Sequence, residues 1–149
     1  MDFKTAEKVL REAAGTDDRL DVDHAYEVAA AAPADVQVEA LLHDVLEDTS
    51  WTVADLRDRG LTLDQAVVLS LLNREDHRDV TYMNWIRRIA EYDANDHGRR
   101  ARQVKLADNQ VNLNRPATEP HHEEMKERRY GRANRILVAA MRERGELPD

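Results

Sequence analysis

The chain contains no cysteine among its 149 residues. Disulfide-linked scaffolds, zinc sites built on thiolates and catalysis by a cysteine nucleophile are therefore excluded. Aromatic residues are scarce, at 5% of the composition, and there are only five glycines and four prolines. A β-sandwich or barrel needs more turn residues and more β-branched or aromatic runs. The composition therefore favours an all-α fold, and the length is sufficient for one domain with a hydrophobic core.

The sequence also lacks any apolar run that approaches the roughly 20 residues of a membrane-spanning helix. Residues 1–5 have neither the charged nor the apolar region of a secretory signal, so we expect a cytoplasmic protein without a membrane partner. The formal net charge is −8. This charge argues against nonspecific binding to nucleic acid, because a phosphate backbone needs a basic surface. Nothing in the sequence indicates the oligomeric state.

Apolar residues recur at helical spacing along most of the chain. Residues 52–55 and 62–65 resemble capping boxes that open short helices. The run 66–72 is apolar on all sides, and the cap before it and the lack of a partner strand favour a helix. We therefore predict a compact helical bundle in which residues 1–149 form a single domain. The longer helices are predicted over 2–14, 22–32, 34–47, 79–93, 96–113 and 118–145.

The most informative segment is 40–49 (ALLHDVLEDT), which carries a histidine and three carboxylates beside an apolar face. His43 and Asp44 are adjacent, about 100° apart on a helix, so both can reach one ion beside it. Glu47 and Asp48 follow one helical turn later. An apolar helix rarely carries such ionisable groups unless they are paired or bind a metal.

Two other parts of the chain supply further candidates. His24 lies in the preceding predicted helix, and Asp108 and Asn112 share one face of a later one. Each residue alone is more simply a core or solvent-exposed side chain. Together with His43 and Asp44, however, they place ionisable groups beside apolar residues without a visible partner, which a metal would supply. Two imidazoles and two carboxylates form a mixed nitrogen and oxygen set that suits Mn²⁺, Fe²⁺ or Zn²⁺.

These residues resemble the hydrolase domain of the RelA/SpoT-type alarmone enzymes and the small stand-alone alarmone hydrolases, which are HD-type phosphohydrolases. The resemblance covers about residues 20–140. Its specific part is the Glu-Asp pair three residues after His-Asp, where general HD phosphohydrolases more often carry Gly-Lys. The resemblance implies an HD-type bundle with four metal ligands, usually to Mn²⁺, which are His24, His43, Asp44 and Asp108.

The same resemblance implies roles for four other residues. Glu47 and Asp48 match the pair that positions and deprotonates the attacking water. Asn112 matches a residue that contacts the nucleotide, and Tyr130 resembles a tyrosine of a late helix near the bound nucleotide.

The chain departs from this family in the loop before the first histidine. The family has a longer loop with an Arg-Lys pair that holds the guanine base and phosphates, whereas residues 15–21 are short and acidic, with Arg19 as their only basic residue. The threonine that usually follows the apolar helix is absent at 72–74. Both differences leave the metal ligands in place and bear on base specificity. Other candidate phosphate contacts are Lys105, Arg87, Arg88, Arg102 and Arg115.

If the substrate is a polyphosphate, the charge distribution predicts that its neutralising cations lie in the second half of the chain. Residues 1–74 hold 7 Lys and Arg against 16 Asp and Glu, whereas residues 75–149 hold 15 against 14. The resemblance implies hydrolysis of the 3′-pyrophosphate from a (p)ppGpp-like nucleotide, a small-molecule partner. Two alternatives stay open: the same chemistry on another nucleotide, such as a nucleoside monophosphate, a dNTP or another purine alarmone, and a non-catalytic HD-like module that senses a ligand.

Overall fold

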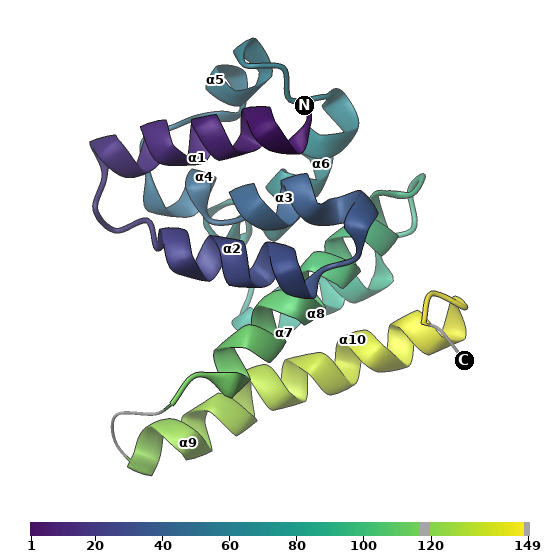
Figure 1. Cartoon of the computed structure of the whole chain (residues 1–149). Coiled ribbons are helices and arrows are strands. Elements are labelled where there is room, and N and C mark those ends of the chain that lie inside the picture. Colours follow the sequence, from purple (N-terminus) through teal and green to yellow (C-terminus); the bar gives the residue numbers. More distant parts are fainter. Residues whose placement is uncertain (117–119, 148–149) are drawn as a thin grey trace.

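Every regular element in residues 1–116 and 120–147, which the computed structural model describes, is helical, so the predicted all-α fold is confirmed. Figure 1 shows α1 on one side of the bundle and α10 on the opposite side. The α-helices are α1 (Phe3–Thr16), α2 (Val22–Ala31), α3 (Gln37–Leu42), α4 (Val45–Asp48), α5 (Val53–Asp58), α6 (Leu63–Leu72), α7 (Tyr82–Glu91), α8 (His97–Asn114), α9 (Pro120–Lys126) and α10 (Arg132–Glu143). Shorter turns are η1 (Ala34–Val36), η2 (Arg74–His77) and η3 (Glu127–Gly131).

The helix α8 runs through the centre of the bundle and packs against α2, α6, α7 and α10. Its apolar residues Ala101, Val104 and Ala107 are buried, as a central helix requires. Lys105 and Asp108 are buried on the same helix. Burial of ionisable groups at this depth is unfavourable unless they are paired or bind a ligand, so α8 carries the first structural sign of a site.

Side-chain caps fix where the helices that carry the site begin. Asp21 accepts a hydrogen bond from the backbone N–H of His24 at 2.9 Å, which starts α2 and places His24 in its first turn. Both predicted capping boxes are present, at Thr52 and at Thr62. The side chain of Thr81 accepts a hydrogen bond from the backbone N–H of Asn84 and caps α7, so that helix begins three residues later than the predicted 79.

The prediction of one continuous helix over 34–47 is wrong. The segment consists of η1, α3 and α4, with a break at His43 and Asp44. The ring Nδ1 of His43 lies 2.6 Å from the carbonyl oxygen of Ala40, and the backbone N–H of His43 donates to the same oxygen. That carbonyl is the acceptor that Asp44 would use in a continuous α-helix. The imidazole therefore competes with the helix and leaves both side chains at a junction between two short helices.

The prediction of one helix over 118–145 also needs correction. Its first residues, 118 and 119, lie outside the described residues. From residue 120 onward α9 and α10 are joined by the π-helical turn η3. Such a turn adds a residue to the helix and is frequent at functional sites. It lets α10 pack its apolar face, with Ala133, Leu137 and Met141 buried, while η3 contacts α8.

Across residues 1–116 and 120–147, no helix combines the length and the apolar character that crossing a membrane would demand.

Candidate metal centre

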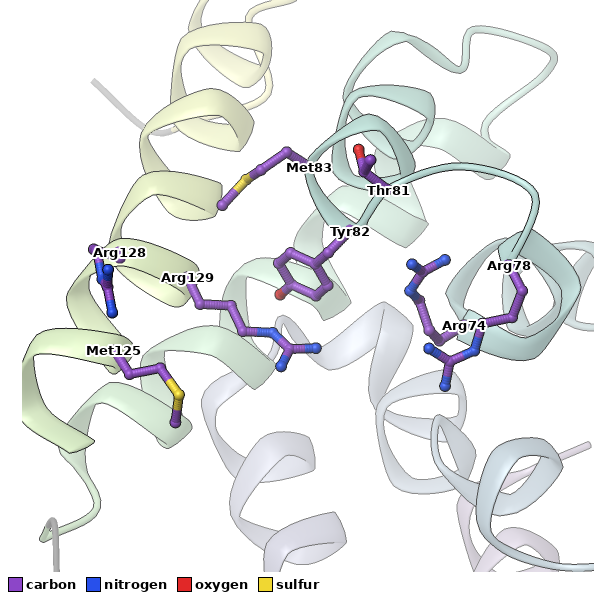
Figure 2. A pocket seen from close by; sticks show the side chains of 8 residues that line it. All are labelled: Arg74, Arg78, Thr81, Tyr82, Met83, Met125, Arg128 and Arg129. Carbon is purple, nitrogen blue, oxygen red and sulfur yellow. The ribbon is translucent and has the colours of Figure 1, made fainter. Parts of the chain in front are cut away.

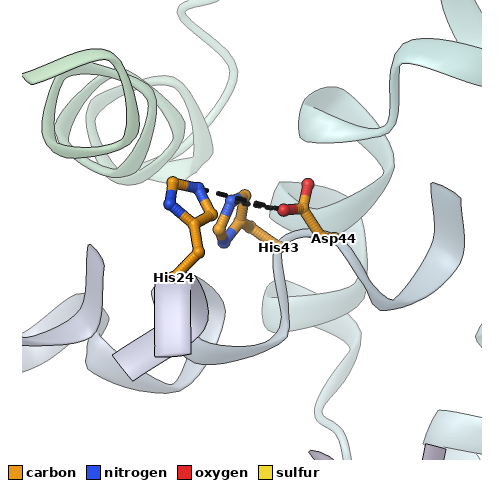
Figure 3. A group of neighbouring side chains, drawn as sticks. All are labelled: His24, His43 and Asp44. Atoms are coloured by element: carbon orange, nitrogen blue, oxygen red, sulfur yellow. Dashed lines mark ion pairs between the residues drawn. The ribbon is translucent and has the colours of Figure 1, made fainter. Parts of the chain in front are cut away.

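Two histidines and an aspartate meet where α2 faces the junction between α3 and α4. One nitrogen or oxygen atom from each of His24, His43 and Asp44 lies within 4.8 Å of the others, and Figure 3 shows the three side chains gathered at this point. The break in the helix is what aims two neighbouring residues into the same space. Because imidazole nitrogens and carboxylate oxygens are common ligands of divalent metals, the group can hold a metal ion.

Asp108 of α8 closes the group from the other side. Its Oδ1 lies 2.8 Å from His24 Nε2 and 3.4 Å from His43 Nε2. The Oδ2 of Asp44 lies 3.1 Å from His43 Nε2 and 4.0 Å from His24 Nε2. Two ligands of one ion, with bonds of about 2.0–2.2 Å, are at most about 4.4 Å apart. All four distances satisfy that limit. His24, His43 and Asp44 can therefore hold one divalent cation, and Asp108 lies close enough to both imidazoles to join them.

The orientation of His43 supports the same interpretation. A carbonyl oxygen can only accept, so the contact between His43 Nδ1 and Ala40 places the ring proton on Nδ1. A neutral ring then presents its Nε2 lone pair to the two carboxylates, and this Nε2 is buried without a hydrogen-bond partner in the described part of the chain. Hydrogen bonding at the distal nitrogen is the usual way in which a protein orients a metal-binding histidine.

The electrostatics of the group also favour a cation. Burial opposes protonation of His43, but the carboxylates of Asp44 and Asp108 outweigh it and raise the pKa of the imidazole well above its usual range. The cluster thus attracts positive charge strongly. A divalent cation satisfies this demand and offsets the mutual repulsion of the two carboxylates.

Lys105 holds Asp108 ionised. Burial raises the pKa of Asp108, but the ammonium group of Lys105, with the two imidazoles, keeps that pKa well below its ordinary value. The Nζ of Lys105 donates to Asp108 Oδ2 at 2.9 Å and lies 4.8 Å from the ring centre of Trp85. The salt bridge occupies Oδ2, which leaves Oδ1 directed at both histidines.

The two carboxylates of α4 stand close to this centre but differ in position. Glu47 lines the cleft above the ligands, whereas Asp48 is not among the described residues that line it. Desolvation and then the charge of Asp44 raise the pKa of Glu47. The same two effects, with the charge of Glu47, raise the pKa of Asp48 to about 6. Both carboxylates are therefore more basic than usual, and Glu47 is the one that faces the cleft.

His24, Asp44 and Asp108 line a cleft of about 320 Å³, whereas the buried His43 is not among the described residues that line it. Three of the predicted substrate contacts, Asn112, Lys105 and Tyr130, line it together with Arg115. Arg19 does not: its guanidinium binds Asp17 at 2.7 Å on the exposed surface. The cations Arg87, Arg88 and Arg102 do not line the cleft either.

Sequence reasoning missed five residues that line the cleft, namely Asp21, Arg74, Tyr82, Trp85 and Arg129. Arg74 follows Asn73 at the start of η2, and Arg129 directly precedes Tyr130 in η3. Both positions adjoin residues already considered in the sequence. Only the tertiary packing of η2 against α6 and of η3 against α8 brings their side chains to the cleft.

Comparison with protein-family models and with curated proteins finds no match for the chain. The functional interpretation therefore depends on the geometry of the cleft and on the motif resemblance.

Proposed function

We propose that this chain is a metal-dependent phosphohydrolase that removes the 3′-pyrophosphate from a (p)ppGpp-like nucleotide. One observation carries the proposal: two imidazoles and two carboxylates, from α2, the α3–α4 junction and α8, converge beneath a cleft lined by cations. The cations suit a phosphorylated substrate, and the ligand set suits a divalent metal. The order of these residues in the chain is what the alarmone hydrolases have.

The residues around the cleft would have different roles in the reaction. His24, His43, Asp44 and Asp108 would hold the metal, with Mn²⁺ as the ion that the resemblance favours. A divalent cation in this position supplies Lewis acidity and a water acidic enough to ionise near neutral pH. Glu47, which lines the cleft, would orient the attacking water and accept its proton, and its raised pKa makes it a better base than an ordinary glutamate. Asp48 supports it through its negative charge.

The cationic wall of the cleft would stabilise the charge that develops on the attacked phosphorus. Lys105, Arg74, Arg115 and Arg129 all line the cleft. Lys105 stays charged because the attraction of Asp108 outweighs burial and raises its pKa. Fixed cations in a cleft of this kind act without reorganisation during the reaction.

The test is to incubate Mn²⁺-loaded protein with guanosine 5′-diphosphate 3′-diphosphate and measure the release of pyrophosphate. The variant Asp44→Asn removes one proposed metal ligand with little other change. Asp44 is only partly buried, and its replacement leaves Lys105 paired with Asp108. Asp58→Asn, at an exposed position of α5, controls for substitution of an aspartate. We expect release by the wild type and by Asp58→Asn and none by Asp44→Asn. Equal release by all three proteins would contradict the proposal.

A second candidate is the same chemistry on another nucleotide. The loop before α2 favours it, because its single cation, Arg19, binds Asp17 and does not line the cleft. The loop therefore offers no base-holding pair of the kind that the alarmone hydrolases use. Release of orthophosphate or triphosphate from a nucleoside monophosphate or a dNTP, with no reaction on the alarmone, would establish this candidate instead.

A further inference from the structure

A second cavity, of about 620 Å³, opens directly beside the metal cleft. Arg74, Tyr82 and Arg129 line both cavities and so form their common border. Figure 2 shows this cavity, which we call the arginine basin, with side chains entering from opposite sides. Its described lining consists of Arg74, Arg78, Thr81, Tyr82, Met83, Met125, Arg128 and Arg129.

The arginine basin is strongly positive, although the whole chain carries a formal charge of −8. Four of its eight lining residues are arginines, and none is acidic. Arg78 binds the exposed Glu75, but Arg128 and Arg129 form no ion pair within the described residues. A cluster of arginines in which only one pairs with a carboxylate carries net positive charge and is a favourable site for an anion.

Two buried polar atoms at the border lack a partner. The Nε of Arg74 and the Oη of Tyr82 have no hydrogen-bond partner in the described structure, and Arg74 is only 9% exposed. The two terminal nitrogens of Arg74 donate to backbone carbonyls, so the guanidinium is fixed without any carboxylate. An unsatisfied buried donor is costly, and a ligand at the border would remove that cost.

Two aromatic rings, that of Tyr82 at the border and that of Trp85 in the metal cleft, contact the border cations. The guanidinium carbon of Arg129 lies 4.2 Å from the centre of the Tyr82 ring, and that of Arg74 lies 5.5 Å from the centre of the Trp85 ring. Trp85 is itself anchored, because its Nε1 donates to Leu71 at 2.9 Å. Cation–π contacts fix a guanidinium while its N–H edge stays available for a phosphate oxygen.

We propose that the arginine basin is a second phosphate subsite, which binds the phosphate groups of the substrate that lie away from the scissile bond. This inference rests on the proposed function for the reaction itself. A substrate that spans the border would place one phosphate over the metal ligands and another among Arg78, Arg128 and Arg129. Guanidinium groups bind phosphate with paired hydrogen bonds, which suits this assignment. The basin would therefore select nucleotides that carry phosphate at two positions.

The kinetic test uses the double substitution Arg78→Gln/Arg128→Gln, because both arginines line the basin and neither lines the metal cleft. Arg142→Gln, at an exposed position of α10, is the matched control. The substrates are guanosine 5′-diphosphate 3′-diphosphate and guanosine 3′-diphosphate, which lacks the remote phosphates. For the first substrate we expect the double variant to raise KM about tenfold or more, with kcat within about twofold. For the second we expect no change.

The proposed subsite would be refuted if the double variant changed KM equally for both substrates. It would also be refuted if KM for guanosine 5′-diphosphate 3′-diphosphate were unchanged. The Arg142→Gln protein should match the wild type on both substrates.

A binding test separates this subsite from the proposed reaction. Inorganic pyrophosphate is titrated calorimetrically into metal-free protein, in which the carboxylates of the cleft repel anions. We expect binding to the wild type and to Arg142→Gln, weaker at higher salt, and its loss in Arg78→Gln/Arg128→Gln. Binding of this pattern in a protein that hydrolyses no nucleotide would refute the proposed function and leave the subsite standing. Hydrolysis without such binding would refute the subsite alone.

Discussion

The raised pKa of Asp48 leads to a prediction about stability that needs no substrate. Its carboxyl has a pKa of about 6 in the folded metal-free protein and 3.8 in the reference state. Between these values the folded state binds the proton more tightly, so the free energy of unfolding falls as pH rises from about 4 to about 6. Well above pH 6 the Asp48 carboxyl is ionised in the folded state, and the loss of unfolding free energy caused by its ionisation is complete. Replacement by a neutral isostere, Asp48→Asn, should therefore stabilise the protein at pH 8.

The expected magnitude follows from the two pKa values. Their difference corresponds to about 3 kcal/mol at most, since one pH unit is about 1.36 kcal/mol. Asp48 is only half-buried, and solvent screening reduces the figure to about 1–2 kcal/mol. The gain should be absent at pH 4, where the native carboxyl is protonated and resembles the amide.

The assay is urea denaturation of chelator-treated wild type, Asp48→Asn and Asp58→Asn from pH 4 to pH 8, followed by tryptophan fluorescence. Trp85 is buried and reports loss of the core. Addition of Mn²⁺ should narrow the gap at pH 8, because a cation at Asp44 offsets one of the charges that raise the pKa of Asp48. The reasoning would be refuted if Asp48→Asn were no more stable than the wild type at pH 8. It would also be refuted if the difference in the free energy of unfolding grew toward acid pH.

Three further predictions concern the ligands and their partners. Mn²⁺ at about 100 times its Kd should raise the Tm of the wild type by about 5–10 °C in a thermal scan and leave the Tm of Asp44→Asn unchanged. An equal rise in both proteins would contradict the assignment of Asp44 as a metal ligand. Glu47→Gln should lower kcat by about 10²–10⁴-fold while the Mn²⁺ affinity, measured by calorimetry, is maintained; unchanged turnover would exclude it as the base. Asp108→Ala should lower the free energy of unfolding, measured by urea denaturation, by about 3–5 kcal/mol because it leaves the buried ammonium of Lys105 unpaired. The double variant Asp108→Ala/Lys105→Met should recover much of that loss. A double variant that is no more stable than Asp108→Ala would refute this cause.

The helical class and the candidate metal-binding group could be predicted from sequence because both depend on local signals. Periodicity and caps indicated helices, and an imidazole beside carboxylates in an apolar segment indicated a site. The break at His43 could not be predicted from spacing. It arises because one imidazole nitrogen competes for a backbone carbonyl, and helical periodicity carries no information about that competition.

The cationic side of the cleft was harder to predict for a different reason. Arg74 and Arg129 belong to two short turns that lie far apart in the chain, and only tertiary packing brings them to one border. Arg19, chosen because it was the only cation of its loop, binds a neighbouring aspartate instead. An exposed arginine has many possible partners, and sequence alone does not rank them.

The distance along the chain between the candidate ligands would make a metal bound there a reporter of folding. His24 and Asp108 are 84 residues apart, so no early fragment of the growing chain contains both. Contacts of such long range form only after a large loop has closed, here when α8 has docked against α2. Uptake of a paramagnetic ion during refolding should therefore follow completion of the tertiary structure rather than formation of the helices. The cleft would thus be the last part of the molecule to become functional.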